Sequence, residues 1–155
     1  YEDLMTQLRY YVAPERLKIL REAPLEERGQ VWSAFLRSSD PSPSTPEHEG
    51  LQTYFARLQQ AGLRFRDDGT SRSGWLSDRA RVYVVMGEPD QLYEQTTNSP
   101  LTRTSIAQRG RLQYWEYSQY RVRLIFYDDT GSGRWRLAPI SETEFQNINA
   151  RLLVH

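Results

Sequence analysis

The stretch GWLSDRARVYVVMGEPDQ, residues 74–91, is the most densely patterned part of the chain and decides how the rest is interpreted. It begins with a glycine–tryptophan pair, continues through Asp78 and Arg79, and reaches a run of β-branched and aromatic residues at positions 82–86. A run of this length and composition is typical of a buried strand. We therefore predict a central β-strand at residues 82–86, ended by a turn at residues 87–90.

The residues that follow this stretch predict the remainder of a sheet. Residues 112–117 and 122–127 are two strand-like runs separated by four residues, which predicts an antiparallel hairpin. Short strands are predicted at residues 92–93 and 134–137. Residues 95–109 are polar and have no steady period, so we predict a long surface loop that offers a second contact surface.

The N-terminal half has helical periodicity. Apolar residues recur every three to five positions between residues 4 and 20, which predicts one or two amphipathic helices interrupted near Pro14. A second helical segment is predicted from Pro24, and a proline-rich turn follows it. Thr45 is the predicted N-cap of a third helix, which we expect to stop near Gly62.

Together these elements predict an α+β fold, with N-terminal helices packed on a small, mainly antiparallel sheet of about four to five strands and with a C-terminal helix. We predict a single domain over residues 1–155, with a helical part at 1–65 and a sheet part at 75–140. The C-terminal helix is predicted at 141–155, with Ser141 as its cap.

The composition excludes several classes of protein. Twenty basic and twenty acidic residues cancel, so no global field attracts nucleic acid or an anionic membrane. Cysteine is absent, which excludes a disulfide framework and a thiolate site, and no apolar run approaches the ~20 residues of a membrane helix. The chain begins at Tyr1, from which we expect a trimmed or processed start.

Five motifs stand in a fixed order along the chain: DPSPSTPEHE at 40–49, GWLSDRAR at 74–81, GEPD at 87–90, WEY at 115–117 and FYDDTGSG at 126–133. In this order they resemble the bacterial domain family named for its GWxTD motif, and they span nearly the whole chain. The chain departs from the family pattern at four positions, where the family has threonine, glycine, asparagine and an arginine: Ser77, Ala80, His48 and Ser39.

The resemblance implies an exported bacterial protein of the cell envelope, on its periplasmic or extracellular side and a lipoprotein candidate. It implies no particular reaction. The order of a strand, a GxPD turn and two further strands also resembles the small lipoprotein of the outer-membrane barrel-assembly machine and modules similar to β-lactamase inhibitors. Those proteins act by binding other proteins, so this weaker resemblance also implies an interaction module.

Asp78 and Arg79 have two interpretations. In one they form a structural cluster, in which Asp78 caps a turn or pairs with an arginine. In the other, Arg79 or Arg81 grips a carboxylate beside the indole of Trp75 and forms a notch that binds a small ligand or a peptide.

A catalytic alternative rests on acidic residues in or near the predicted turns and strands: Glu88, Asp90, Glu116, Asp128 and Asp129. Two carboxyl groups at a defined separation would suit a hydrolase of envelope glycan. The pair would consist of Glu116 with Asp78, Asp90 or Asp128. No sequence motif of a hydrolase or a phosphate-binding loop supports this alternative.

Metal binding is not predicted. The only histidines, His48 and His155, lack the spacing of zinc ligands. Residues 128–133 resemble a calcium loop but lack its later acidic ligands, so a hairpin turn is the better interpretation. We predict no metal and no cofactor.

The aromatic content, with ten Tyr, four Trp and five Phe, favours protein binding. We expect Tyr117, Tyr127 and Trp135 to point outward from a strand and to form a binding face. The sequence therefore predicts a non-catalytic accessory module that docks onto a protein or membrane-protein complex, without nucleic acid and with membrane contact only through a partner or an anchor. The candidate binding residues are Trp75, Asp78, Arg79, Arg81, Glu116, Tyr117, Tyr127 and Trp135.

Overall fold

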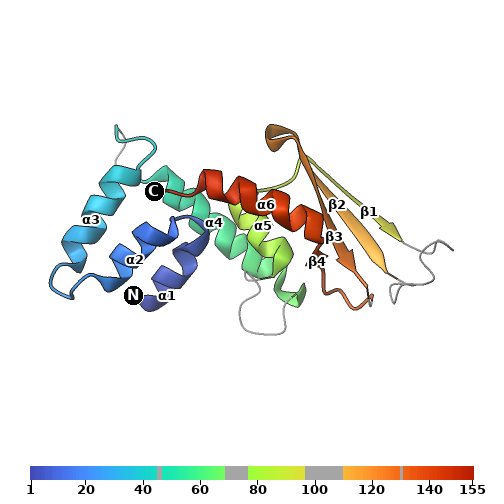
Figure 1. Cartoon of the computed structure of the whole chain (residues 1–155), viewed down its shortest axis with the longest axis horizontal. Coiled ribbons are helices and arrows are strands. Elements are labelled where there is room, and N and C mark those ends of the chain that lie inside the picture. Colours follow the sequence, from blue (N-terminus) through green and yellow to red (C-terminus); the bar gives the residue numbers. More distant parts are fainter. Residues whose placement is uncertain (45–46, 69–76, 97–109, 130) are drawn as a thin grey trace. The chain divides into compact units, whose positions relative to one another are not determined.

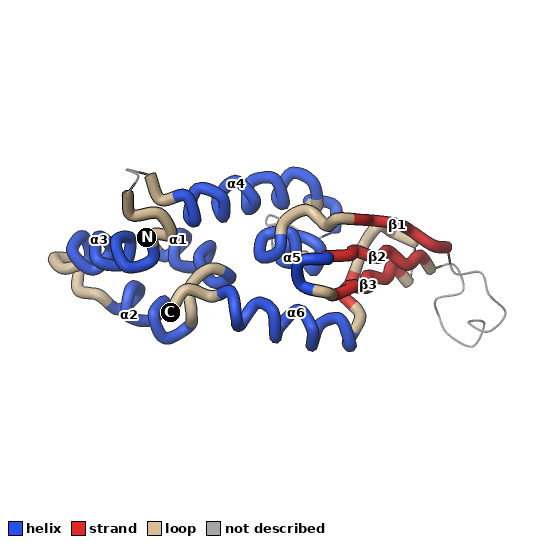
Figure 2. The backbone as a smooth tube through the Cα atoms, turned by 90° about the horizontal axis from the view of Figure 1, so that it is seen from above, coloured by secondary structure: helices blue, strands red, loops and turns tan. Residues whose placement is uncertain are grey.

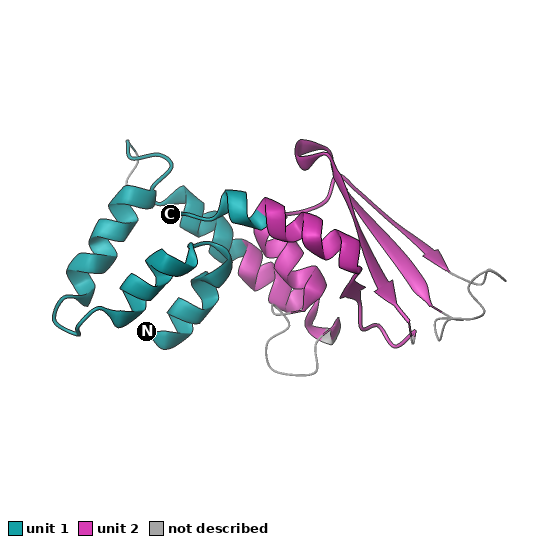
Figure 3. Ribbon diagram, viewed as in Figure 1, with its two compact units in different colours: residues 1–56, 149–155 teal, residues 57–148 magenta. Residues whose placement is uncertain are grey.

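The computed structural model describes residues 1–44, 47–68, 77–96, 110–129 and 131–155 (Figure 1). The chain divides into two compact units, one formed by residues 1–56 and 149–155 and the other by residues 57–148 (Figure 3). The first is helical, and the second holds helices together with a four-stranded antiparallel sheet. The predicted α+β class is thus confirmed, while the prediction of one domain over residues 1–155 stays a prediction.

The first unit contains short helices around an apolar core. Its elements are α1 (Glu2–Gln7), η1 (Leu8–Tyr10), α2 (Pro14–Glu22), α3 (Arg28–Ser39) and the beginning of α4 (Glu49–Arg64). Met5, Leu8, Leu20 and Phe35 are fully buried. The predicted interruption is confirmed, since Pro14 occupies the first turn of α2, where its missing N–H costs nothing.

Two predicted helix boundaries in the N-terminal half of the chain are wrong. Helix α3 begins at Arg28 rather than at Pro24, because residues 24–27 form a turn in which the carbonyl of Pro24 accepts from Glu27 N and Arg28 N. Leu25 lies in this turn and is 77% exposed, so it does not join the apolar face of the helix. Helix α4 continues through Gly62 to Arg64, and the predicted stop is therefore absent.

Helix α4 is capped by an imidazole. The predicted cap, Thr45, lies outside the described residues, and His48 stands directly before the first helical residue, where its Nδ1 accepts from Leu51 N at 3.1 Å. Because Nδ1 is an acceptor, the ring proton lies on Nε2, which donates to Ser39 Oγ at 2.9 Å. Ser39 Oγ in turn donates to the carbonyl of Phe35.

The predicted central strand at residues 82–86 is wrong, because these residues form the end of helix α5 (Asp78–Met86). Ser77 caps the helix, and its Oγ accepts from Ala80 N at 3.3 Å. Gly87 ends it with a φ of 81°, a conformation that suits glycine. Caps at both ends therefore favour a helix, and an apolar run that is buried on several sides suits an interior helix as well as a strand.

The sheet has the order β1-β2-β3-β4 and is antiparallel throughout. Its strands are β1 (Gln91–Thr96), β2 (Arg111–Tyr117), β3 (Val122–Asp128) and β4 (Arg136–Leu137). The predicted hairpin is confirmed, and a short 3-10 helix, η5 (Ser118–Tyr120), connects β2 to β3. The predicted surface loop is wrong at Gln95 and Thr96, which belong to β1, and its residues 97–109 lie outside the described residues.

The helices of the second unit lie on one side of this sheet (Figure 2, Figure 3). Trp115 on β2 contacts Phe126 on β3 with ring centroids 4.7 Å apart, and Phe65, directly after α4, lies 5.7 Å from Trp115. Alternate residues of β2 and β3 are buried against this layer, whereas the residues between them are more exposed. The weaker resemblance required a strand before the turn at residues 87–90, and helix α5 stands there instead.

The final helix, α6 (Pro139–Leu152), begins before the predicted cap. Ser141 lies inside its first turn, where its Oγ accepts from Ile125 N on β3 at 2.9 Å. Ser141 therefore ties the helix to the sheet instead of capping it. In the ranges that the structure describes, no helix is both long and apolar enough to cross a membrane.

The cap of α4 generates a prediction about stability. Replacing His48 with alanine removes the acceptor for Leu51 N, so the free energy of unfolding should fall by about 1 kcal/mol. The control is His48→Asn, whose amide oxygen can accept the same bond while it also loses the contact with Ser39. Guanidinium unfolding followed by far-ultraviolet circular dichroism measures both variants. Equal losses in both would show that the cap contributes nothing.

Candidate functional site

Asp78 joins helix α5 to the sheet. Its Oδ2 accepts from the backbone N–H of Leu137 on β4 at 2.7 Å, and its Oδ1 accepts from two nitrogens of Arg81 at 3.0 and 3.1 Å. Both carboxylate oxygens are therefore engaged within the fold. This geometry agrees with the structural interpretation of Asp78 and leaves no oxygen directed at a substrate.

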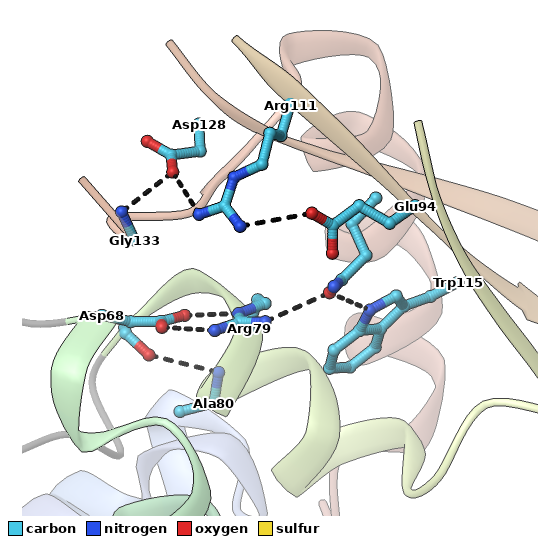
Figure 4. Close-up of polar contacts among 10 residues, drawn as sticks. Asp68, Arg79, Ala80, Glu94, Arg111, Trp115, Asp128 and Gly133 are labelled. Carbon is cyan, nitrogen blue, oxygen red and sulfur yellow. Dashed lines mark hydrogen bonds and ion pairs between the residues drawn. The ribbon is translucent and has the colours of Figure 1, made fainter. Parts of the chain in front are cut away.

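Arg79 lies in the interior of the second unit. Its Nε and Nη2 donate to the two carboxylate oxygens of Asp68 at 2.5 Å each, and its Nη1 donates to Gln113 Oε1 at 3.2 Å (Figure 4). The guanidinium carbon stands 4.9 Å from the ring centroid of Phe65 and 5.2 Å from that of Trp135. The Asp68 side chain is only 1% exposed, so this is a buried ion pair between aromatic rings.

The notch that the sequence analysis proposed around Arg79 has no support from this geometry. The guanidinium uses all three of its nitrogens inside the fold, and Trp75, the predicted aromatic partner, lies outside the described residues. Arg81, the other candidate, donates to Asp78 and to both carboxylate oxygens of Glu142. The hydrogen bond from Arg81 holds the pKa of Glu142 below its usual value, although desolvation acts in the opposite direction.

Asp128 anchors the loop that follows β3. Its side chain is fully buried, and its Oδ2 accepts from Arg111 Nη2 and from Gly133 N, both at 2.9 Å (Figure 4). Burial by itself would raise the pKa of Asp128, but the Arg111 hydrogen bond and the loop N–H groups hold that pKa below its usual value. The calcium-like motif is thus organised around a carboxylate that an arginine already neutralises. The described residues hold no cluster of three or more potential metal ligands.

Two of the acidic candidates, Asp90 and Glu116, line one open pocket. Glu116 Oε1 accepts from Tyr93 Oη at 2.9 Å and from Arg123 Nε at 3.0 Å. Asp90 Oδ2 accepts from Ser118 N at 2.6 Å and from Ser118 Oγ at 2.5 Å, and these bonds lower the pKa of Asp90. A glycosidase needs one carboxyl group that stays protonated near neutral pH. The surroundings of Asp90 favour its ionised form instead, and Glu116 is already held by a tyrosine and an arginine.

The remaining acidic candidates also give no catalytic arrangement. Glu88 pairs with Arg64 at 2.5 Å on the surface, and Asp129 is half-buried in the loop that Asp128 anchors. The two histidines lie apart from this pocket in the sequence, with His48 at the start of α4 and His155 at the exposed end of the chain.

The side of the sheet that faces away from the helices, which we call the outer face, carries three rows of side chains across β1, β2 and β3. From the pocket end the rows are Gln91, Glu116 and Arg123, then Tyr93, Tyr114 and Ile125, then Gln95, Leu112 and Tyr127. The first row is polar and charged. The second and third bring apolar and aromatic side chains to an open sheet face.

Four of these residues form a connected cluster, which we call the tyrosine–arginine patch: Tyr93, Tyr114, Glu116 and Arg123. The rings of Tyr93 and Tyr114 are stacked, with centroids 5.0 Å apart and planes 22° apart. The Arg123 guanidinium lies 5.8 Å from the first ring centroid and 5.6 Å from the second, and it pairs with Glu116 at 2.9 Å.

The pocket beside the patch has a volume of about 440 Å³ and lies where β1 begins and β2 connects to β3. Its lining combines charged, polar and apolar residues: Asp90, Gln91, Glu116, Tyr117, Ser118, Arg121, Val122 and Arg123. Arg121 has a φ of 52° and a ψ of 45°, and among the described residues it is the one non-glycine residue with positive φ.

Two residues that were predicted to point outward and form the binding face are buried instead. Tyr117 is 3% exposed, and its hydroxyl donates to the carbonyl of Gly87 at 2.7 Å. Trp135 is 5% exposed and lies between the guanidinium groups of Arg79 and Arg111. The register of β2 and β3 places Tyr117 on the buried side, whereas Trp135 lies directly before β4 and is buried by its contacts with these two arginines. Tyr127 does lie on the outer face, as does Glu116.

Sequence reasoning missed the residues that build the patch and the charged end of the pocket: Tyr93, Tyr114, Arg121 and Arg123. The alternation of residues 112–117 was visible and divides them into two faces. It does not say which of the two faces the helices cover. The side with Trp115 is covered, so Tyr114 and Glu116 are directed outward.

The ion pair of Arg79 generates a stability prediction. Arg79→Met removes the arginine that neutralises the buried Asp68 carboxylate, so the free energy of unfolding should fall by about 3–5 kcal/mol. The double variant Arg79→Met with Asp68→Leu should recover most of that loss, because no buried charge remains unpaired. Urea unfolding followed by tryptophan fluorescence measures both. A cost below about 1 kcal/mol for Arg79→Met would mean that the pair behaves like a surface salt bridge.

Asp128 generates a prediction about pH. Its pKa is lower in the folded protein than the ordinary value of about 3.9, so its contribution to stability is complete above that value. The contribution is lost as the pH falls through the lower, folded-state pKa. The stability difference between the wild-type protein and Asp128→Asn should therefore be constant near neutral pH and should shrink below about pH 5. A difference that grows on acidification would contradict the assignment; denaturation between pH 7 and pH 3 measures it.

The comparisons with known proteins identify a family and no individual relative. Neither the curated proteins nor the solved structures include a significant match to the chain. The family described as the GWxTD domain matches residues 1–124 of the 155 residues. This match covers most of the chain, including α5, the pocket and the greater part of the outer face. The chain belongs to the GWxTD domain family.

Proposed function

We propose that this protein is a non-catalytic interaction module that docks onto a larger protein or membrane-protein complex of the cell envelope through the outer face of its sheet. The observation that carries the proposal is the tyrosine–arginine patch. Two stacked tyrosine rings and a guanidinium lie on a sheet face that the helices of the same unit leave uncovered.

The composition of the patch suits a protein interface. Tyrosine and arginine are enriched among the residues that dominate binding energy, and aromatic rings supply contact area with few rotatable bonds. The side chains are also held in place before a partner arrives, because Glu116 accepts hydrogen bonds from both Tyr93 and Arg123. Binding to a prearranged surface loses less side-chain entropy.

Strand β1 adds a second feature of an interaction surface. All six of its residues are exposed, and among the described strands none pairs with its outer edge. Leu92 and Tyr93 are 41% and 39% exposed. An unpaired edge offers backbone N–H and C=O groups to an extended segment of another protein, and the neighbouring side chains then select that segment.

The family resemblance supports the placement in the cell envelope, as an accessory subunit or a lipoprotein domain. The engagement of Glu116 by Arg123 and of Asp90 by Ser118 favours binding over hydrolysis of glycan. An interaction role also requires no metal and no cofactor. The partner in this proposal is a protein.

Site-specific photo-crosslinking in the native host tests the proposal. With a photoreactive benzoylphenylalanine in place of Tyr93, we expect a discrete adduct in the envelope fraction. The double variant Tyr114→Ala with Arg123→Ala should reduce its yield about tenfold or more, since it removes the rest of the aromatic and cationic surface. Circular dichroism of the purified variant confirms that it is folded.

The matched control places the same photoreactive residue at Lys18 on α2, whose side chain is 71% exposed in the first unit. No adduct is expected there. The absence of an adduct from position 93, or the same adduct from position 18, would show that the outer face is not the docking surface.

A further inference from the structure

We propose that the pocket beside the tyrosine–arginine patch binds a carboxylate of the partner, so that the segment docked on the outer face is an acidic peptide and Arg121 is the residue that binds its acidic group. This inference rests on the proposed function, because it assumes that a protein segment lies on the outer face. It adds the chemistry of that segment.

The position of Arg121 favours contact with a ligand in the pocket. It lines the pocket, is exposed, and follows η5 in a left-handed conformation that ordinary side chains adopt at a cost. This backbone conformation lets η5 lead directly into β3, and it places Arg121 in the lining of the pocket. A fold that needed only the turn would be served by glycine, which adopts this conformation without cost.

The charged groups around Arg121 leave its guanidinium without a salt bridge. Two carboxylates and two guanidinium groups line the pocket, and Glu116 and Arg123 neutralise one another at 2.9 Å. Asp90 accepts both the N–H and the hydroxyl of Ser118 on one oxygen. Arg121 forms no salt bridge with either carboxylate or with any other residue that the structure describes. The N–H donors of its guanidinium are therefore available to a ligand.

The number of available cations favours a carboxylate over a phosphate. A phosphate group carries up to two negative charges and is normally held by several N–H donors or cations. One guanidinium without a salt bridge matches the planar, bidentate geometry of a carboxylate. The ionised Asp90 in the same lining repels a doubly charged phosphate more strongly than a singly charged carboxylate.

Continuity with the outer face favours a peptide as the source of that carboxylate. Glu116 and Arg123 belong to both the patch and the pocket lining, and Gln91 lies at the beginning of the exposed strand β1. A peptide that covers Tyr93 and Tyr114 can therefore place a glutamate or aspartate side chain in the pocket. The volume of about 440 Å³ accommodates such a side chain.

Nuclear magnetic resonance titration of the full chain with defined peptides tests this inference. The probe is an acetylated and amidated hexapeptide of sequence VTYEVT, and its match has glutamine in place of the glutamate. We expect the glutamate peptide to shift the Nε–H signal of Arg121 and to bind about tenfold more tightly than the glutamine peptide, because it adds a charge-assisted hydrogen bond. Inorganic phosphate, titrated separately, should leave that signal nearly unchanged.

Arg121→Gly removes the guanidinium and keeps the backbone conformation, so it should abolish the preference for the glutamate peptide. The matched control is Arg134→Gln, which removes one exposed positive charge from outside the pocket and should preserve the preference. Equal binding of the two peptides, or an unchanged preference in Arg121→Gly, would overturn the inference. Phosphate shifting the Arg121 signal more strongly than the glutamate peptide would overturn it in favour of a phosphate site.

The same spectra distinguish this failure from failure of the proposed function. If both peptides shift Tyr93 and Tyr114 equally, the outer face binds a peptide while the assignment of Arg121 is wrong. If neither peptide shifts any of these signals, the inference and the docking face fail together.

Discussion

The second unit depends on two consecutive residues, Asp78 and Arg79, at the beginning of α5. Asp78 fixes this helix end to strand β4 through Leu137, while Arg79 reaches Asp68 on one side and Gln113 on β2 on the other. Charged groups thus join helix α5 to strands β4 and β2. Hydrophobic packing alone is less directional and would allow the helix to shift along the sheet. Burying these charges is costly, and the cost is offset only because the hydrogen-bonding geometry is complete. These hydrogen bonds define one position of α5 on the sheet.

The side of the sheet that the helices cover determines which side chains the other side presents. With Trp115 and Phe126 directed into the core, the alternation along β2 and β3 directs Tyr114, Glu116 and Arg123 outward. The packing of the core therefore determines which side chains form the proposed binding surface. Acidic side chains near the pocket, which resembled a catalytic pair in the sequence, are already engaged by a serine and an arginine. This engagement is one reason for proposing recognition of a partner rather than bond breaking.

The sequence predicted the class of the fold, the hairpin of β2 and β3 and the short strand β1, because alternation and turn residues are local signals. It failed at residues 82–86, where five apolar residues satisfy both periodicities and only the caps Ser77 and Gly87 decide between them. Of the predicted binding residues, Glu116 and Tyr127 lie on the outer face, whereas Tyr117 and Trp135 are buried. Their orientation depends on which face the helices cover, and that is a tertiary property.

The contact between Ser39 and His48 joins two of the four positions at which this chain departs from the family pattern. His48 accepts from the first turn of α4 with one ring nitrogen and donates to Ser39 with the other, so each residue completes the hydrogen bonds of its neighbour. An arginine at position 39 offers no acceptor for the Nε2 proton of His48, and an asparagine at position 48 lacks the second ring nitrogen that donates to Ser39. Ser39 and His48 therefore depend on each other, because the hydrogen bond between them needs both residues. Relatives that carry one of them should carry the other, and the pair should be exchanged together when sequences of the family are recombined.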